Sequence, residues 1–239
     1  MGFTAKYFTN WDEKDLKELT ILPPYEPKDR QIQWVRGSIR NKWEDGIFRE
    51  FTVTGPKMKT CYSGCNWNRI SFAMNGSFDP EVYNFERWTR SVCEHVKESI
   101  FSDPSKFKPG AMSNSRFVFD DDYIKPSNNP AIYPDEMKVR LSTKKVPDST
   151  GEGFDDVSDA DLFLYCEDGN HIPINPVDIR AGSSIVPILK FSYYRNIERF
   201  GLVITLIRGM VFLGNEKSAA RVENQDWDLD YISMDAMTV

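Results

Sequence analysis

The hydrophobic pattern of the first quarter of the chain changes from helical to strand-like spacing. A short polar helix is predicted first, with Asn10 as its N-cap, and Pro23-Pro24 ends it. Residues 31–39 and 47–54 then alternate with period two, and the turn dipeptide Asp45-Gly46 separates them. Because successive side chains of a strand point to opposite faces, these two runs predict a β-hairpin.

A long amphipathic helix follows a third predicted strand at residues 69–74. Asp79 is a suitable N-cap, Pro80 suits the first helical position, and apolar residues then recur at spacings of three and four as far as Ile100. Such spacing places them on one face of the helix. Residues 105–134 are rich in Pro, Ser, Asn and Asp, which predicts a mostly irregular segment.

The second half of the chain returns to strand patterns. Residues 148–161 interrupt them with an acidic stretch that has no Lys or Arg, and we expect this stretch to be a solvated insertion. The predicted strands cover residues 137–141, 162–166, 171–174, 185–194 and 202–212.

The order of these elements favours a mainly β (α+β) fold. Many short strands with turn signals, and one long helix after the third strand, are typical of an OB-fold-like Greek-key barrel. The sequence shows no strand–helix–strand alternation of the kind that would indicate a parallel sheet. The predicted organisation is an N-terminal extension with a short helix (1–27), an OB-fold-like domain with the acidic insertion (28–215) and an acidic C-terminal tail (216–239).

The net charge of −6 comes from 36 acidic and 30 basic residues in a chain of 239. It argues against a uniformly cationic nucleic-acid binder and leaves a locally basic surface open. No run of about 18 uncharged apolar residues is present, and no basic stretch precedes an apolar core at the N-terminus. We therefore expect an intracellular protein without a membrane segment. The four cysteines fit a reducing compartment better than a disulfide framework.

The sequence offers few groups for catalysis. It has two histidines and none of the common catalytic or phosphate-binding motifs. Cys61-x3-Cys65 and Cys93-x-His95 supply soft metal ligands, but Cys93 and His95 point to different faces of the predicted helix. Buried or incidental thiols are the alternative to a zinc site. We expect a protein that is not an enzyme and that needs no cofactor and no metal.

Residues 28–69 combine positive charge with aromatic side chains. They include nine basic residues against four acidic ones, an excess of five. Single-stranded nucleic acid needs cations near its phosphates and flat side chains on which bases stack. Arg36 and Arg40 share a strand face with Trp34, and a second aromatic and basic set lies between the last two long strands. The candidate nucleic-acid-binding residues are Trp34, Arg36, Arg40, Lys42, Trp43, Arg49, Lys57, Lys59, Arg69, Tyr193, Tyr194, Arg195 and Arg199.

Ordinary packing is the alternative explanation for this segment. Aromatic residues in strands usually belong to the core, and surface Lys and Arg are common. Phe48 and Phe51 fall on opposite faces of their strand, so we expect at least one of them to be buried.

The C-terminal tail is a candidate regulatory segment. From Val222 onward it has five acidic residues and no basic residue, and Trp227, Tyr231 and Met234 are interleaved with them. Such a segment can occupy a basic groove in place of DNA, or dock onto partner proteins. A frayed acidic terminus is the alternative. The candidate regulatory residues are Asp226, Trp227, Asp228, Asp230 and Tyr231.

Short segments of the chain resemble a known family. They are Thr54-Gly55-Pro56-Lys57-Met58 followed by Gly64, and Ile179-Arg180-Ala181-Gly182-Ser183-Ser184-Ile185-Val186-Pro187-Ile188-Leu189 leading to Arg199-Phe200-Gly201-Leu202. Together with the order of elements, they resemble the single-stranded DNA-binding proteins of nucleocytoplasmic large DNA viruses. Those proteins are similar to the replication single-stranded DNA-binding protein of short-tailed phages. The resemblance covers roughly residues 28–215.

The resemblance implies an OB-fold that coats single-stranded DNA during viral DNA replication, recombination and repair, in the host cytoplasm (viral factory) or nucleus. It also implies an acidic tail that competes with DNA or contacts replication proteins. The tail departs from the phage pattern, because it ends in Ala236-Met237-Thr238-Val239 and not in an aromatic residue. The expected partners are single-stranded DNA and replication proteins, with no membrane, and a homodimer is left open.

Two other function classes stay open at this point. A viral structural or scaffold protein would use a β-barrel and exposed aromatic residues for protein contacts. A metal-dependent enzyme would use the acidic clusters or the cysteines.

Overall fold

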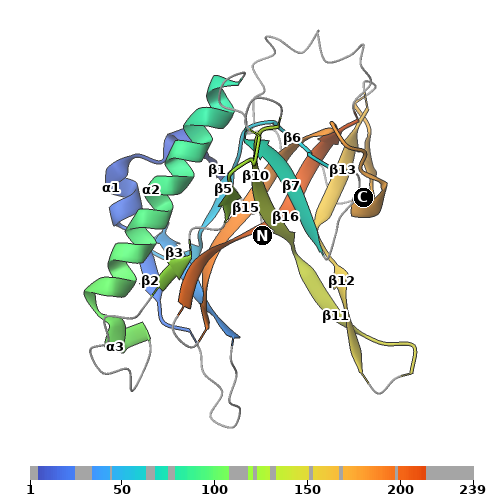
Figure 1. The fold of residues 1–239 in the computed structure, drawn as a ribbon. Coiled ribbons are helices and arrows are strands. Elements are labelled where there is room, and N and C mark those ends of the chain that lie inside the picture. Colours follow the sequence, from blue (N-terminus) through green and yellow to red (C-terminus); the bar gives the residue numbers. More distant parts are fainter. Residues whose placement is uncertain are drawn as a thin grey trace.

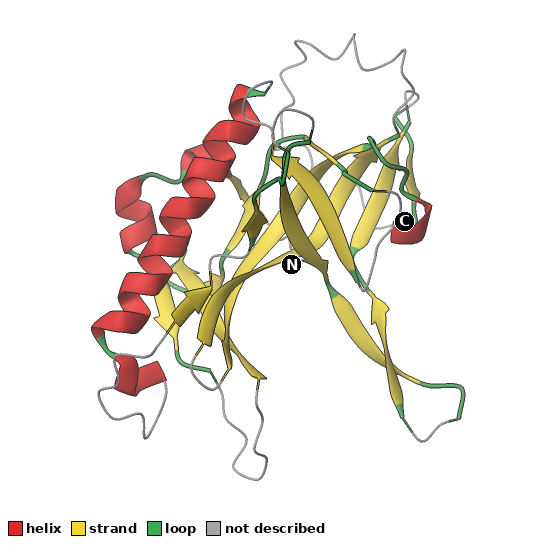
Figure 2. Cartoon of the chain, in the orientation of Figure 1, coloured by secondary structure: helices red, strands yellow, loops and turns green. Residues whose placement is uncertain are grey.

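In the computed structural model, the described residues form more strand than helix, with one 14-stranded sheet and one two-stranded sheet (Figure 2). A mainly β fold with one long helix was predicted, and this part of the prediction is confirmed. The structure describes residues 5–24, 34–43, 45–62, 68–74, 79–107, 118–120, 123–129, 133–150, 153–166, 169–196 and 199–213.

The N-cap of the first helix lies two residues later than predicted. Asp12 caps α1 (Glu13–Lys17), because its Oδ1 accepts a hydrogen bond from Asp15 N at 2.8 Å while Asp15 Oδ2 accepts one from Asp12 N at 3.3 Å. Asn10 instead ends the 3₁₀ turn η1 (Phe8–Asn10). Two short strands, β1 (Lys6–Tyr7) and β2 (Thr20–Leu22), flank this helical segment.

The long helix α2 (Pro80–Ser102) forms as predicted. Asp79 Oδ1 accepts hydrogen bonds from Glu81 N at 3.0 Å and Val82 N at 3.3 Å, and Pro80 occupies the first turn. Among the described residues, no helix is long and apolar enough to cross a membrane. A short helix, α3 (Pro104–Phe107), follows. The buried face of α2 consists of Val82, Phe85, Thr89, Val92, Cys93, Val96 and Ile100.

An aromatic cluster joins α2 to the sheet. The Trp88 ring lies 5.6 Å from the Phe191 ring and 6.1 Å from the Phe51 ring, measured between centroids. Both phenylalanines are buried, as is Phe8, whose ring meets Phe85 edge-on. The helices therefore cover one side of the sheet (Figure 1), and the largest side chains of the core lie beneath them.

The predicted hairpin is present around Gly46. It joins β3 (Trp34–Lys42) to β4 (Phe48–Glu50), and Trp43 N donates to Ile47 O at 3.0 Å across the turn. Gly46 has a φ of 79°, which an L side chain rarely adopts. After β4 comes β5 (Thr52–Thr54). Phe51 is buried and Phe48 is 46% exposed, so the expectation for this pair is confirmed.

Two long antiparallel strands, β15 (Ser184–Asn196) and β16 (Arg199–Phe212), form the centre of the main sheet. Strand β15 also pairs with β3, β5 and β6 (Met58–Lys59). On the other side, β16 pairs in parallel with β8 (Val118–Asp120), β10 (Asp135–Leu141) and β13 (Asp161–Tyr165). The sheet is therefore mixed, because it contains both antiparallel and parallel strand pairs.

Strand β7 (Arg69–Met74) has the predicted bounds and pairs with β10. Thr60, which follows β6 directly, forms a bridge to Phe72 of β7. The segment formed by β6 and Thr60 therefore lies beside both β15 and β7. The remaining elements of the main sheet and its loops are β9 (Ile124–Lys125), β14 (His171–Pro173) and the 3₁₀ turn η2 (Pro176–Asp178).

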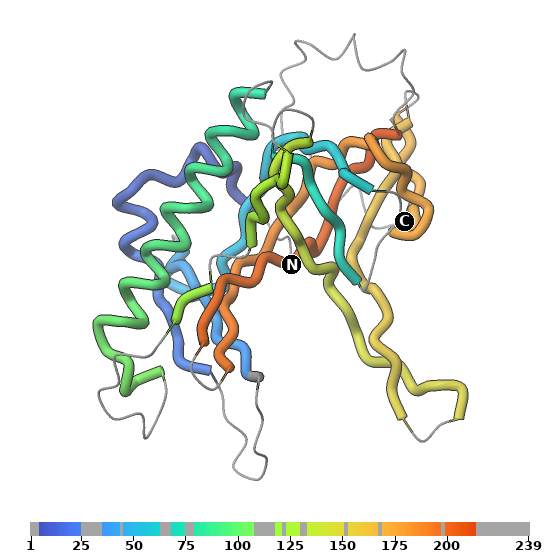
Figure 3. The backbone as a smooth tube through the Cα atoms, viewed as in Figure 1, coloured from blue at the N-terminus to red at the C-terminus, as the bar shows by residue number. Residues whose placement is uncertain are grey.

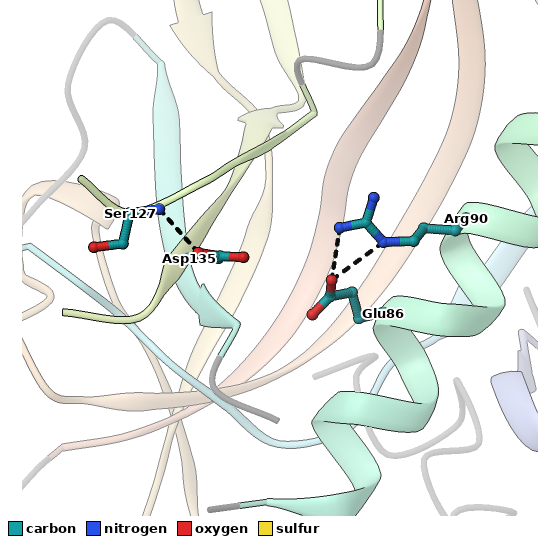
Figure 4. Close-up of polar contacts among 4 residues, drawn as sticks. All are labelled: Glu86, Arg90, Ser127 and Asp135. Carbon is teal, nitrogen blue, oxygen red and sulfur yellow. Dashed lines mark hydrogen bonds and ion pairs between the residues drawn. The ribbon is translucent and has the colours of Figure 1, made fainter. Parts of the chain in front are cut away.

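Local polar contacts hold the loop between β9 and β10 and the turn of α2 that contains Glu86 and Arg90. Ser127 N donates to Asp135 Oδ1 at 2.9 Å, which ties this loop to the first residue of β10 (Figure 4). On α2, the Arg90 guanidinium contacts Glu86 Oε1 at 2.7 Å, one helical turn away (Figure 4).

A separate hairpin projects from the body of the molecule (Figure 1). It consists of β11 (Thr143–Pro147) and β12 (Phe154–Ser158), which pair with each other. The sequence predicted a solvated loop over 148–161. Most of its described residues are exposed, as predicted. The prediction of a loop is wrong for β12, because pairing with β11 gives these acidic residues a strand conformation that their composition does not indicate.

Candidate nucleic-acid interface

Several strands of the main sheet present polar side chains to the same side. Lys190 of β15 lies opposite Thr205 of β16, and Thr205 lies opposite Arg140 of β10. Arg140 in turn lies opposite Arg69 of β7. Tyr194 shares the face of Lys190 because it lies four residues further along the same strand. Since cross-strand partners project from the same face, these residues form one row across the sheet.

Strand β3 extends this row. Arg36 lies opposite Tyr194, and strand alternation places Arg40 and Lys42 on the same side as Arg36. On β10, Lys138 accompanies Arg140 for the same reason. We call this surface the basic face, and its residues are Arg36, Arg40, Lys42, Arg69, Lys138, Arg140, Lys190 and Tyr194.

The side chains between these residues point into the core. On β3, β7 and β10 every intervening side chain is buried, and the helix α2 packs on that side through Phe191 of β15. Arg36, Lys42 and Arg69 are exposed, and the other five residues of the basic face are half-buried. The basic face is therefore on the side of the sheet that the helices leave open. The intervening buried residues are Val35, Gly37, Ile39, Asn41, Ile70, Phe72, Met137 and Val139.

Like charges lie close together on the basic face. Burial lowers the pKa of the Arg140 guanidinium, and the positive charges of Arg36 and Arg69 lower this pKa further. Among the described residues, no carboxylate forms an ion pair with these three arginines or with Lys138. Lys190, by contrast, lies 3.3 Å from Glu50 Oε2. The uncompensated cations make this part of the surface attractive to an anion.

A small cavity opens among these cations. Its volume of ≈ 130 Å³ is well below the roughly 300 Å³ at which sites for drug-sized ligands begin. Its wall includes Arg69, Lys138, Arg140 and Tyr194, and the underlying strand β16 contributes residues 202–204. The wall also includes the Asp120 carboxylate and the Tyr123 ring. A space of this size, with three cations beside one carboxylate, has room for a phosphate group and not for a large organic ligand.

Tyr194 has a fixed position on the basic face. Its ring lies over Gly201 of β16, where a Cβ atom would come within 2.4 Å of the ring. Its hydroxyl donates to Asp120 Oδ2, and Arg199 Nη1 donates to Asp120 Oδ1 at 3.1 Å. Asp120 lies opposite Gly201 in the sheet. One carboxylate therefore holds both Tyr194 and Arg199 at the edge of this cationic surface.

Two predicted contact residues are in the core instead. Tyr193 is fully buried and its hydroxyl donates to Leu22 O at 2.6 Å. Arg195 is 9% exposed and its Nη1 donates to Phe107 O at 3.0 Å. The prediction is wrong for these two residues because strand alternation turns the odd-numbered residues of this part of β15 toward the core.

The predicted residues of the β3–β4 turn lie on the other side of the hairpin. The Arg49 guanidinium is 4.6 Å from the centroid of the Trp43 ring and 2.6 Å from Asp45 Oδ2. Arg49 lies opposite the buried Asn41, so it faces away from the basic face. The structure does not bring Trp43 and Arg49 together with the basic face. Trp34 begins β3, and its side chain is outside the described residues.

Lys57 and Lys59 lie near the far end of β15. Lys59 is opposite Ser184, ten residues from Tyr194, or about 33 Å at the usual rise of a strand. The Lys57 ammonium is 4.0 Å from the centroid of the Phe212 ring, and burial lowers its pKa. These two lysines are not part of the basic face. The tail residues Asp226, Trp227, Asp228, Asp230 and Tyr231 all lie outside the described residues.

Sequence reasoning missed Lys138, Arg140 and Lys190. The alternation of residues 137–141 placed Lys138 and Arg140 on a polar strand face, and this was the available signal. It did not show that β10 lies between β7 and β16. That neighbourhood comes from pairing between distant segments, and it brings Arg140 next to Arg69.

The part of the chain that the structure describes contains no group of three or more His, Cys, Asp or Glu side chains that could hold a metal ion. Cys93 is buried, and burial raises the pKa of the Cys61 thiol to about 11. Cys65, the second residue of the proposed pair, lies outside the described residues.

Solved structures of phage proteins are similar to this fold. One is gp2.5, a single-stranded DNA-binding protein encoded by bacteriophage T7, with 12% identity, a TM-score of 0.45 and coverage of 73% of this chain and 98% of that chain. Another is the single-stranded DNA-binding protein from bacteriophage Enc34, with 13% identity, a TM-score of 0.38 and coverage of 87% and 98%. No family model and no curated protein sequence matches the chain.

Proposed function

We propose that this protein binds single-stranded DNA through the basic face, with little dependence on base sequence. The observation that supports the proposal is the group of cations Arg36, Arg69 and Arg140 beside the ring of Tyr194, which form no ion pair with a carboxylate of the described residues. Cations follow the phosphates of a flexible strand, and an aromatic ring accepts any base, with about 1–3 kcal/mol for each stacked base. The basic face supplies both groups within one surface.

A single strand fits this surface better than a duplex. Direct reading of duplex DNA uses a helix or a two-stranded ribbon that enters the major groove. The cations here project from several adjacent strands of a sheet, and the long helix α2 packs on the opposite side. Stacking on Tyr194 also requires an unpaired base.

The finer assignments belong to the same proposal. The neighbourhood of β6 with both β15 and β7 supports an OB-fold-like barrel. The sequence resemblance to the single-stranded DNA-binding proteins of large DNA viruses supports a role in viral DNA replication, recombination and repair. It also supports action in the host cytoplasm or nucleus, and recruitment of replication proteins by the acidic tail.

Fluorescence anisotropy with labelled oligo-dT tests the DNA-binding surface. We expect Arg69→Gln with Arg140→Gln to weaken binding at least about tenfold and to reduce the salt slope by about 0.7 for each lost phosphate contact. Arg87→Gln is the matched control, because Arg87 is an exposed arginine on α2. Equal affinity of the wild type for single-stranded and duplex DNA, or equal losses in both variants, would contradict the proposal.

Deletion of residues 222–239 tests the tail as an internal competitor. We expect the truncated chain to bind oligo-dT more tightly, because five carboxylates no longer compete for the cations. The difference should shrink as salt rises, since screening weakens both interactions. Unchanged or weaker binding would remove the competing-tail part of the proposal and leave the basic face untouched.

A further inference from the structure

The β11–β12 hairpin is a direct continuation of the strand that carries Arg140. Only Ser142 separates β10 from β11. Ser142 N donates to Leu206 O of β16 at 2.9 Å, and Ser142 O accepts from Asp159 N at 2.9 Å. The backbone therefore stays extended and paired through this point. Figure 3 shows the chain running from β10 into β11 and away from the body.

The side of β10 that bears the basic face continues along β11 of the hairpin. Lys138, Arg140, Ser142 and Lys144 follow one another at period two, so Lys144 is on the side of Arg140. Lys145 is on the opposite side. Both lysines are exposed, and they differ in the face on which they lie.

The cross-strand partners complete this face of the hairpin. Val157 lies opposite Lys144 and is 43% exposed, and Asp155 lies opposite Val146 further from the body. This side of the hairpin therefore carries Lys144 and Val157, with the exposed Asp159 beside Ser142 at its base and Asp155 further out. Within the described residues, the hairpin pairs with no strand other than its own two. A lone two-stranded hairpin is marginally stable in water, so an occupant of this face would also stabilise it.

We propose that the single-stranded DNA path continues from the basic face onto the Lys144 side of this hairpin, an inference that rests on the proposed function. Lys144 contacts a phosphate, and Val157 offers apolar surface to a sugar or base. Continuity with the basic face and the charge of Lys144 select this occupant. Lys144 lies four residues from Arg140, or about 13 Å at the usual rise of a strand, which places it one further contact along the path. Asp155 repels phosphate and marks the limit of the path.

Lys144→Ala and Lys145→Ala form a matched pair on full-length protein. Each removes one exposed lysine from the same strand, and each changes the net charge equally. We expect Lys144→Ala to weaken oligo-dT binding about three- to tenfold and to lower the salt slope by about 0.7, while Lys145→Ala changes affinity less than about twofold. Equal effects of the two variants, or no effect of Lys144→Ala, would overturn the proposal. Circular dichroism checks that both variants keep the wild-type fold.

Two further variants separate this proposal from the one on which it rests. Asp155→Asn should tighten binding about twofold, because it removes the repelling carboxylate on the same face; weaker binding would count against the path. Arg140→Gln reports on the basic face itself. If Arg140→Gln weakens binding and Lys144→Ala does not, the extension is wrong and the basic face stands. If neither weakens binding, both proposals fail.

Discussion

At the residue scale, Arg140 shows a conflict between stability and binding. It is half-buried and lies within electrostatic reach of Arg36 and Arg69, which together with burial lower its pKa. Such an arrangement disfavours the charged side chain in the folded protein. A bound anion would supply the missing opposite charge, and in the proposed complex a DNA phosphate is that anion.

Arg140→Gln should therefore have opposite effects on the fold and on binding. We expect the free energy of unfolding to rise by about 0.5 kcal/mol, a small gain because solvent screens the half-exposed charges, while oligo-dT affinity falls. Urea denaturation and anisotropy measure the two quantities. Salt should stabilise the wild type more than the variant, since it screens the repulsion. A variant that is less stable than the wild type at every salt concentration would contradict this account.

Asp120 limits the anion affinity of the same surface. Its carboxylate accepts from Tyr194 and Arg199 and would repel a phosphate at the edge of the basic face. We expect Asp120→Asn to tighten oligo-dT binding about two- to threefold at low salt, with the gain lost at high salt. Asp161→Asn is the control, because Asp161 also pairs with an arginine, Arg208, at 2.8 Å. An equal gain in both variants would indicate net charge alone.

At the element scale, α2 and the strands have separate roles. The strands carry cations on one face and apolar side chains on the other, so one-residue slips in register would bury arginines. The helix closes the apolar side through Trp88 and does not reach the basic face. Changes at its ends should therefore affect stability and leave DNA affinity alone.

Asp79→Ala tests this separation. The variant loses the hydrogen bonds to Glu81 N and Val82 N at the start of α2, and we expect the free energy of unfolding to fall by about 1 kcal/mol. Oligo-dT affinity, measured where the variant is fully folded, should stay within about twofold of wild type. Glu94→Ala, an exposed site in the middle of α2, should change stability by much less. A loss of affinity in Asp79→Ala would show that α2 takes part in binding.

At the scale of the whole molecule, folding and binding are linked. A ligand that binds only the folded protein stabilises it, by about 2.7 kcal/mol at a free concentration of 100 times Kd. Thermal denaturation should therefore show a Tm that rises with oligo-dT concentration. The rise should nearly vanish in the Arg69→Gln, Arg140→Gln double variant and persist in Arg87→Gln. A Tm that does not respond to oligo-dT in the wild type would contradict binding to the folded chain.

The sequence was sufficient for features that depend on neighbouring residues. Strand β7, the cap and first turn of α2, and the turn at Gly46 all form as predicted. Each is encoded within about one helical turn or one hairpin, where local propensity and side-chain period act directly. The same local signals placed Arg36 and Arg40 on one face.

The sequence was insufficient wherever a distant strand decides the outcome. Tyr193 and Tyr194 are adjacent and chemically alike, yet one is buried and the other lies on the basic face. When a strand has apolar and aromatic residues on both faces, the sequence does not show whether its odd- or even-numbered side chains point into the core. Strands β11 and β12 were missed because their pairing overrides the composition of the acidic segment.

By itself, the sequence determined where the longest strands of the main sheet lie, where α2 begins and ends, and that positive charge is concentrated apart from the acidic segments. Only the tertiary structure decided which cations meet. Arg69 and Arg140 are 71 positions apart in the chain and become cross-strand partners when β7 pairs with β10. The two-residue repeat of a strand decides to which face each side chain points. The register between distant strands decides which side chains lie next to each other, and a binding surface depends on that arrangement.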